Sequence, residues 1–429
     1  MNDALDRRQD LAARPVNVLW LIDHVCYDGS LHGGGRLFMN LVPQLDQRQV
    51  RIFPYFLRAS AEVEQVFKGA PIKVTNLNKG KYDLSTLPAI NRLCRQHDID
   101  VMHLFCYASS TFGRLVGRVR GVATVVHDFD TQVYFPYPLY LKIADRLLAP
   151  GTARAFAASS FCRDYMHDVR RIARHRIEVM FHAIPARQLA LANSLGRASA
   201  RARLQWPDDR FVFCAVTKLG PERGNETLIR AFASVRAQLP QARLVIVYKP
   251  TYYHRVPKEY ENIPWIKDAN AMRQHVQTLI DDTGCNGAVE LVESLDSPED
   301  YYAASDVMVA PFENVRFSSV NLIEAMAYGR PHIVTAIGEP GEIAALWHTG
   351  VTVPPGDAEA LAAAMRTLAS DPARLHDLSD RARLAAKSFT TPAVAERLAH
   401  VYGALAAGIE PRAVGADAAE ARGAEMRGA

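Results

Sequence analysis

The chain has 429 residues, of which 49% are hydrophobic and 22% charged, a composition typical of a globular protein with room for two or three domains. No apolar run approaches the roughly 20 residues that span a bilayer, and residues 1–14 lack the apolar core of a secretory signal. The six cysteines are widely spaced without a C-x-x-C pair, which favours reduced thiols over zinc ligands or disulfides and predicts a cytoplasmic protein.

The net charge of +4 is unevenly distributed. Residues 1–200 carry 26 Lys and Arg against 17 Asp and Glu, a net of +9, whereas residues 201–429 carry 24 against 29, a net of −5. A basic half beside an acidic half suggests that only one of them meets anionic material. A phosphorylated substrate, anionic lipid headgroups and nucleic acid all remain open, beside solvated surface charge without a partner.

The amino-terminal half alternates strand-like and helical patterns. Val16–Ile22 is almost continuously apolar, as expected for a strand buried on both faces. A Gly-rich turn and a helical pattern follow it. Further strand-like runs are residues 50–57, 101–105, 123–127 and 155–159. Strands that alternate with helices predict a parallel sheet with right-handed crossovers.

The same alternation restarts after a polar, Ala- and Arg-rich helical stretch at residues 187–203. Its strands are predicted at residues 211–216, 242–248, 289–292, 307–310 and 332–335. We therefore predict two facing Rossmann-like domains, residues 15–195 and 205–390, with ligands in the cleft beyond the carboxyl ends of the strands. Residues 391–405 form a final helix that could pack back on the first domain, and residues 406–429 form a mobile tail.

Two loops carry candidate anion-binding groups. Gly33, Gly34 and Gly35 lie between a buried strand and a helix, where backbone amides and the helix dipole attract a phosphate. A simple tight turn is an equal alternative, because the spacing is not G-x-G-x-x-G. Lys218 and Arg223 follow another buried strand and could clamp a diphosphate, although two exposed loop cations also fit a plain surface loop.

Two other segments of the first half are ambiguous. His127 and Asp128 end a predicted strand, and Asp128 with Asp130 could bind a divalent metal, but no third ligand is evident and we expect no metal. Residues 135–141 are aromatic and apolar, with Lys142 close behind. They could contact a membrane or an acceptor, or simply pack against the domain.

The stretch 321–343 is the most informative. An apolar run carries Glu324 into Gly329 and Pro331, and a second Gly-rich turn ends in Glu342. A carboxylate at a helix start beside two Gly-bearing turns could bind a polyhydroxylated ligand, because backbone amides face outward there and glycine permits close approach. An ordinary helix–strand–turn with Glu324 solvated remains the alternative.

Together these segments resemble the retaining glycosyltransferases of family 4, which have the GT-B fold. The resemblance is carried by Lys218-x4-Arg223-Gly224, by Tyr302-Ala-Ala-Ser-Asp306, by Glu324-Ala-Met-Ala-x-Gly329-x-Pro331, by Gly338-x-x-x-Glu342 and by the segment 350–357, in the order of the family. The amino-terminal half matches more loosely, through the Gly-rich turn and His127-Asp128.

The resemblance implies a role for each candidate residue. Glu324 would accept hydrogen bonds from the ribose hydroxyls of a nucleoside diphosphate sugar. Lys218 and Arg223 would hold the diphosphate and neutralise the leaving group. Backbone amides at Ser319, Val320 and Asn321 would bind the same phosphates. His127 would lie against the donor sugar, and the turn at Gly33, Gly34 and Gly35 would lie near the diphosphate or the acceptor.

The chain departs from the family pattern at several positions. Where the family has Glu-x7-Glu with Glu324 as the second carboxylate, the first position is Arg316, and Glu313 could substitute for it. Thr217-Lys218 stands for the usual Gly-Arg, and Arg223 for a Lys, which keeps the positive charge and changes the hydrogen-bond geometry. His182-Ala183 replaces an Asn-Gly pair.

The resemblance thus implies a cytoplasmic retaining hexosyltransferase that needs neither metal nor cofactor. Its partners would be a nucleotide-sugar donor and a lipid-linked or polysaccharide acceptor in envelope or exopolysaccharide synthesis. Peripheral membrane contact through the basic first domain would accompany this activity. Two alternatives stay open: a non-catalytic sugar-nucleotide-binding protein on the same scaffold, and a GT-B-like sugar-nucleotide epimerase. Nothing indicates a nucleic-acid partner beyond positive charge.

Overall fold

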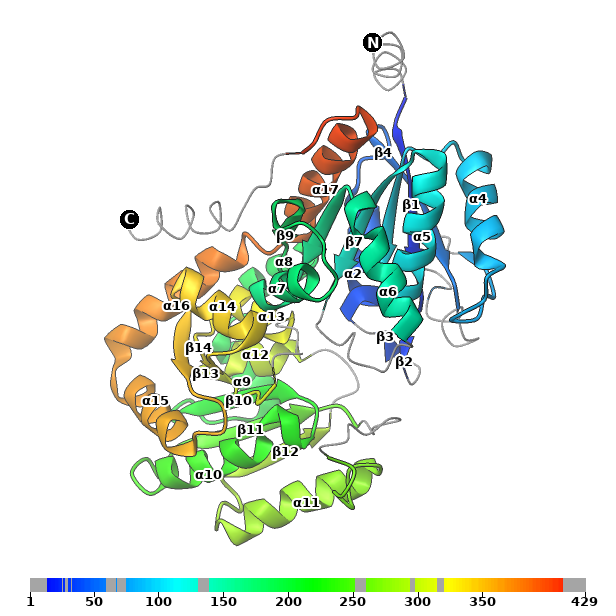
Figure 1. Cartoon of the computed structure of the whole chain (residues 1–429). Coiled ribbons are helices and arrows are strands. Elements are labelled where there is room, and N and C mark those ends of the chain that lie inside the picture. The colour runs from blue at the N-terminus through cyan, green and yellow to red at the C-terminus, as the bar shows by residue number, and fades with distance from the viewer. Residues whose placement is uncertain are drawn as a thin grey trace. The chain divides into compact units, whose positions relative to one another are not determined.

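The structure, a computed structural model, describes residues 14–24, 26–27, 30–31, 33–58, 67, 75–129, 139–250, 260–293, 298–314 and 320–411 (Figure 1). These residues divide into two compact units, each with its own parallel sheet. The first unit contains the described residues up to Pro185 and those from Phe389 onward. The second unit is Ala186–Ser388.

The sheet of the first unit has seven strands in the order β5-β4-β1-β6-β7-β8-β9. Their bounds are β1 Val16–Ile22, β4 Val50–Phe56, β5 Thr75–Asn76, β6 Val101–Phe105, β7 Ala123–Asp128, β8 Arg154–Ala157 and β9 Ile177–Val179. All of these pairs are parallel. A short antiparallel pair, β2 Cys26–Tyr27 and β3 Ser30–Leu31, precedes the first helix. The central strands are buried on both faces, which explains their continuous apolar sequences.

Helices cover both faces of this sheet. They are α2 Gly33–Leu41, α4 Thr86–Gln96, α5 Tyr107–Arg120, α6 Leu139–Leu148, α7 Ser160–Asp168 and α17 Thr391–Ala406, with 3-10 turns η1 Val42–Gln44, η2 Ala149–Gly151 and η3 Arg174–Arg176. Apolar side chains of α2 and α17 pack with Val18 and Trp20 on one face. Those of α4 and α5 pack with Leu19 and Leu21 on the other. The alternation of side chains along β1 therefore supplies two cores.

The last helix, α17, belongs to the first unit although the second unit precedes it in the chain (Figure 1). Trp20 donates its indole N–H to the hydroxyl of Tyr402 over 3.0 Å, and the same hydroxyl lies 2.5 Å from Nδ1 of His103. Both Trp20 and Tyr402 are fully buried. These contacts fix α17 on β1 and β6.

The sheet of the second unit has six parallel strands in the order β12-β11-β10-β13-β14-β15. Their bounds are β10 Val212–Thr217, β11 Arg243–Tyr248, β12 Val289–Glu293, β13 Val307–Ala310, β14 His332–Thr335 and β15 Gly350–Val353. The order reverses beside β10, which pairs with β11 on one side and β13 on the other. In such sheets ligands bind at the carboxyl ends of the strands at the reversal.

The helices of the second unit also lie on both faces. They are α8 Ala186–Ser194, α9 Arg197–Leu204, α10 Asn225–Arg236, α11 Ala269–Asp282, α12 Glu299–Ala304, α13 Val320–Ala327, α14 Gly338–Trp347, α15 Ala358–Ser370 and α16 Pro372–Ala386, with η4 Pro221–Arg223 before α10. One core joins α10, α11 and α15 to the sheet. The other joins α12 and α13 to the opposite face.

Two local expectations were wrong. Gly33, Gly34 and Gly35 do not form a turn before a helix but begin α2 itself. The boundary between the two units lies between residues 185 and 186, whereas we expected it between residues 195 and 205. Helix α8 belongs to the second unit because it packs against α13. Glycine is a poor helix former in the interior of a helix. The first backbone N–H groups of any helix lack an intrahelical partner, so in this respect glycine is no worse there than another residue.

Candidate functional site

The loop after β10 holds the two predicted diphosphate-binding cations. Lys218 follows the last residue of β10 and is exposed, whereas Arg223 ends η4 and is half-buried. Between them the loop is held by Asn225, whose side-chain amide donates to the carbonyls of Lys218 and Gly220, each over 3.2 Å. Asn225 is 3% exposed, so it is a structural support of this loop.

Gly224 fixes the loop against the end of β13. Its φ of +67° lies in the left-handed region, which side chains disfavour. A Cβ at this position would overlap the carbonyl oxygen of Pro311 and lie 2.9 Å from its carbonyl carbon. The backbone amide of Glu313 also donates to the carbonyl of Glu222 over 3.0 Å. Only glycine permits this approach, which sets the position of Arg223 relative to the residues after β13.

Arg223 lies over the ring of Phe312, with 5.5 Å between its guanidinium carbon and the ring centroid. The hydroxyl of Thr335 donates to the carbonyl of Phe312 over 2.6 Å, which anchors that ring at the end of β14. The planar guanidinium of an arginine stacks favourably on an aromatic face. The ends of the neighbouring strands β10, β13 and β14 therefore determine where the guanidinium of Arg223 lies.

Glu313, the predicted substitute for the missing first carboxylate, lies beside this loop. Its side chain is exposed, and Oε1 accepts a 2.7 Å hydrogen bond from the hydroxyl of Thr227 in the first turn of α10. Arg316 and Ser319 lie outside the described residues. Their predicted roles stay predictions.

Glu324 is 9% exposed and both of its carboxylate oxygens accept hydrogen bonds. Oε1 accepts from the amide of Gln188 over 3.1 Å, and Oε2 accepts from the hydroxyl of Tyr302 over 2.9 Å. Burial, together with the neighbouring charge of Glu324, raises the pKa of Tyr302 well above its usual value, so this hydroxyl stays protonated and remains a donor. The alternative of a solvated Glu324 is therefore wrong.

These two hydrogen bonds orient the carboxylate of Glu324. Sequence reasoning missed both supports. Tyr302 appeared in a family motif without a role, and Gln188 lies 136 residues from Glu324 in the chain, where no local pattern could link them.

The first helical residues after the undescribed loop are Val320 and Asn321. The side-chain amide of Asn321 donates to the carbonyl of Val216 over 2.8 Å, which ties the start of α13 to the carboxyl end of β10. The structure thus brings Lys218, Arg223, Glu313, Val320 and Asn321 to the carboxyl edge of the second sheet, with Glu324 one turn farther along α13.

The remaining predicted residues lie in the first unit. His127 is 1% exposed and stacks between rings, with its centroid 4.4 Å from that of Phe129 and 5.3 Å from that of Phe105. Burial, with a smaller contribution from the nearby His182, lowers the pKa of His127 to about 3. This imidazole is neutral at physiological pH, so it can accept or donate a hydrogen bond but cannot act as a cation.

Asp128 is 6% exposed and belongs to a buried ion-pair network. Arg170 donates to its carboxylate over 2.5 Å and also pairs with Asp145. A metal bound by Asp128 would have to compete with that guanidinium. Asp130 and the segment 135–138 lie outside the described residues. Among those described, no three His, Cys, Asp or Glu side chains form a group that could hold a metal, and no helix is long and apolar enough to cross a bilayer.

The chain matches known families over most of its length. Residues 196–385 match the family described as glycosyl transferases group 1, and residues 31–188 match glycosyltransferase family 4. The D-inositol 3-phosphate glycosyltransferase of Kineococcus radiotolerans is 26% identical, over 93% of this chain and 94% of that protein. The protein of the same name from Thermobispora bispora is 29% identical, over 71% and 70%.

Solved structures agree in fold. A glycosyltransferase from Rickettsia africae has a TM-score of 0.72 at 13% identity, over 91% of this chain and 98% of that one. Anabaena HepE in complex with UDP has a TM-score of 0.70 at 15% identity, over 90% and 98%. With two parallel Rossmann-like sheets and the family matches in both halves, the chain belongs to glycosyltransferase family 4 and has the GT-B fold.

Proposed function

We propose that this glycosyltransferase transfers a hexose from a nucleoside diphosphate sugar to a hydroxyl acceptor with retention of anomeric configuration. The observation that carries the proposal is the carboxyl edge of the second sheet. There Gly224 and Asn225 hold Lys218 and Arg223 beside the start of α13, and Glu324 follows one turn later. Two cations beside a helix start suit a diphosphate.

In this proposal each residue acts by charge or orientation. Lys218 and Arg223 neutralise the negative charge that develops on the departing diphosphate, the role that metal ions have in other transferases. Glu324, oriented by Gln188 and Tyr302, accepts hydrogen bonds from the ribose. Neutral His127 contributes a hydrogen bond to the donor sugar. Transfer is expected to persist in EDTA.

A thermal-shift screen with UDP, GDP, ADP, CMP and dTDP sugars tests donor binding, because a ligand of the native state raises the melting temperature. UDP sugars come first, since HepE is known in complex with UDP. Donor hits then enter transfer assays, with D-inositol 3-phosphate, the acceptor named in the relatives, among simple sugars and lipid-linked glycans.

The outcomes separate the competing functions. Transfer to any acceptor supports the proposal. Binding without turnover across the panel makes the chain a sugar-nucleotide-binding protein, and donor conversion without an acceptor makes it an epimerase. Transfer that is abolished by EDTA and restored by a divalent metal refutes metal independence.

We also propose that the first unit contacts an anionic bilayer, which would place the enzyme beside a lipid-linked acceptor at the inner face of the cell membrane. Helix α6 exposes an apolar stripe at Leu139, Ile143 and Leu147, which are 71%, 48% and 68% exposed. Lys142 and Arg146 lie on the same helix. An apolar stripe flanked by cations is the pattern of a helix that lies in a membrane interface.

Vesicle flotation tests this contact. The protein should float with vesicles that contain phosphatidylglycerol and much less with neutral phosphatidylcholine. Ile143→Glu with Leu147→Glu should abolish flotation. The control Leu384→Glu, at a 48% exposed position of the second unit, should not. Equal flotation with both lipids, or flotation insensitive to the α6 variants, refutes the contact.

A further inference from the structure

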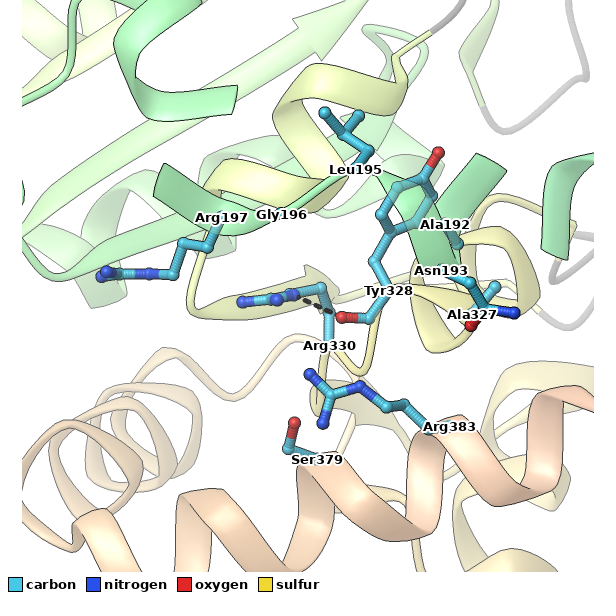
Figure 2. Close-up of a pocket in the computed structure, with 10 residues that line it drawn as sticks. All are labelled: Ala192, Asn193, Leu195, Gly196, Arg197, Ala327, Tyr328, Arg330, Ser379 and Arg383. Carbon is cyan, nitrogen blue, oxygen red and sulfur yellow. Dashed lines mark hydrogen bonds between the residues drawn. The ribbon is translucent and has the colours of Figure 1, made fainter. Parts of the chain in front are cut away.

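A polar pocket lies in the unit Ala186–Ser388, and Figure 2 shows the residues that line it. It lies at the opposite edge of the sheet from Lys218 and Arg223. It has a volume of about 440 Å³ and is formed by the α8–α9 connection, the end of α13 and helix α16. Strand β13 runs from the pocket to the proposed donor site. Asp306 lies just before β13, at the amino edge of the sheet with the pocket, whereas Phe312 and Glu313 follow β13 at the carboxyl edge, where we propose that the donor binds. The pocket is therefore separate from the proposed donor site.

Arg330 is the central cation of this pocket. Its Nε donates to the carbonyl of Tyr328 over 3.0 Å and its Nη1 to the carbonyl of Ser305 over 2.6 Å. Among the described residues these are its hydrogen bonds, and Nη2 makes none. Burial lowers the pKa of Arg330 to about 10, against the attraction of Asp306 and with smaller contributions from the repulsion of Arg383, Arg197 and Arg201. The guanidinium is thus held in place without an ion-pair partner of its own.

Asp306, the nearby carboxylate, is already occupied. Arg197 donates to Oδ1 through Nε and Nη2, over 3.1 and 2.8 Å. Arg201 and the backbone amide of Val212 both donate to Oδ2 over 2.8 Å. Asp306 therefore forms its ion pairs with Arg197 and Arg201, and it attracts Arg330 without forming an ion pair with it.

Arg383, on α16, adds a second cation. Its guanidinium carbon would lie 2.5 Å from a Cβ on Gly329, a residue whose φ of +70° also requires glycine. The absence of that Cβ lets the guanidinium lie against the backbone between Tyr328 and Arg330. Its ion pair is with Asp380 at 3.3 Å, and both of those side chains are at least half exposed. Exposed pairs of this kind are weak, so the pocket keeps an excess of positive charge.

Tyr328 supplies an independent sign of a missing ligand. It is 4% exposed and lines the pocket, yet its hydroxyl has no hydrogen-bond partner among the described residues. Figure 2 shows its ring directed toward Leu195 and Ala192, with the guanidinium groups of Arg330 and Arg383 at the other end of the residue. Buried hydroxyls are normally paired. A ligand with a polar group at each end could bond both to the hydroxyl of Tyr328 and to the guanidinium groups.

We propose that this pocket binds a small phosphorylated metabolite, with its phosphate on Arg330 and Arg383 and a hydroxyl of its body on Tyr328. Guanidinium groups match the geometry of phosphate oxygens and keep their charge at any physiological pH. The volume of about 440 Å³ lies in the lower part of the range for ligand sites, which favours a small ligand. The site is additional to the donor site and does not depend on its assignment.

Isothermal titration of the intact chain at constant ionic strength tests the proposal, with inorganic phosphate and glucose 6-phosphate as probes and chloride and glucose as blanks. Arg383→Gln should weaken both phosphorylated probes about tenfold, the loss of one charge-assisted pair. Tyr328→Phe removes only an unpaired hydroxyl, so the fold should persist while the affinity for glucose 6-phosphate falls.

Two controls make the result decisive. Arg381→Gln, on the same helix but paired with Asp377 over 2.9 Å and outside the pocket, should leave both affinities unchanged. Lys218→Ala with Arg223→Ala should also leave them unchanged. The proposal is overturned if phosphate binds no better than chloride, if Arg383→Gln has no effect, or if phosphate binding disappears in the Lys218 and Arg223 variant.

Discussion

The close approach of Gly224 to Pro311 gives a sharp quantitative prediction, because a matched glycine isolates the effect. Gly224 and Gly284 both lie in the second unit with a φ of +67°. Around Gly284 a Cβ would meet nothing within 4 Å, whereas at Gly224 it would overlap the Pro311 carbonyl. Alanine at either site meets the same backbone penalty, and only at Gly224 does it also collide.

The magnitudes follow from these two terms. Gly284→Ala should lower the free energy of unfolding by about 1–2 kcal/mol, the cost of a left-handed backbone for a residue with a Cβ. Gly224→Ala carries the same cost plus about 1–3 kcal/mol for displacing a packed backbone segment. The displacement must open the contact to at least the 3.0 Å that real Cβ atoms keep. Because Arg223 precedes Gly224, nucleotide affinity should fall with stability.

Urea denaturation of both variants at the same pH measures the difference, and nucleotide titration measures its effect on the site. The two variants share a unit, so any separate unfolding of the other unit affects both equally. A Gly224→Ala chain that is no less stable than Gly284→Ala, or that binds nucleotide as tightly, would refute the reasoning about this loop.

Three further predictions concern the site and the buried histidines. Replacing Lys218 and Arg223 together by Ala should abolish nucleotide binding in a titration while circular dichroism shows an intact fold, and normal turnover would show that the cations are not the diphosphate clamp. Glu324→Gln should weaken nucleotide binding by about 1–3 kcal/mol, the cost of an impaired hydrogen bond to a buried group, whereas Tyr302→Phe should weaken it less; unchanged affinity in Glu324→Gln removes this residue from the site. Burial lowers the pKa of His332 to about 3. Below about pH 6.5 the histidine of the unfolded chain therefore takes up a proton, whereas His332 of the folded chain stays neutral. The free energy of unfolding consequently decreases as the pH is lowered from about 6.5 to 3, by up to about 1.4 kcal/mol per pH unit. His332→Gln should reduce that slope in denaturation curves between pH 7 and 5, and an equal slope would contradict the assignment.

The strands were the most predictable part of the fold. Val16–Ile22, Val101–Phe105 and Val307–Ala310 have the bounds expected from their apolar runs. A parallel strand covered by helices on both faces has almost no polar position, so its sequence reports its burial directly. The helix-to-strand alternation then indicated the parallel sheets, and the ordered motifs indicated the GT-B family.

The contacts between distant segments were not predictable in this way. Gly224 is visible in the sequence, but the reason for a glycine is not. The loop after β10 approaches Pro311 at the end of β13 too closely for any other residue. The partners of Glu324 come from α8 and α12. The burial of Glu324 could not be foreseen from the sequence of α13, in which it is the only charged residue. Contacts of this kind depend on how helices and strands pack together, and they produce no periodic pattern in the sequence.

Charge illustrates the same limit. The excess of +9 in residues 1–200 favoured an anionic partner for that half, but part of its basic content is internal. The side chains of Arg114, Arg154 and Arg170 are at most 1% exposed and pair with Asp145, Glu178 and Asp128. These arginines hold α5, α6 and the strands together and offer nothing to a ligand.

The acidic half, in contrast, carries the two groups of cations that we propose to bind phosphate groups. Lys218 and Arg223 lie at one edge of its sheet, and Arg330 and Arg383 at the other. What distinguishes Arg330 from the buried pairs is the supply of carboxylates: Asp306 is shared by Arg197 and Arg201 and has no oxygen left for Arg330. A net charge counts cations and carboxylates over a whole half, whereas binding depends on which cations remain without a carboxylate at the place where a ligand fits.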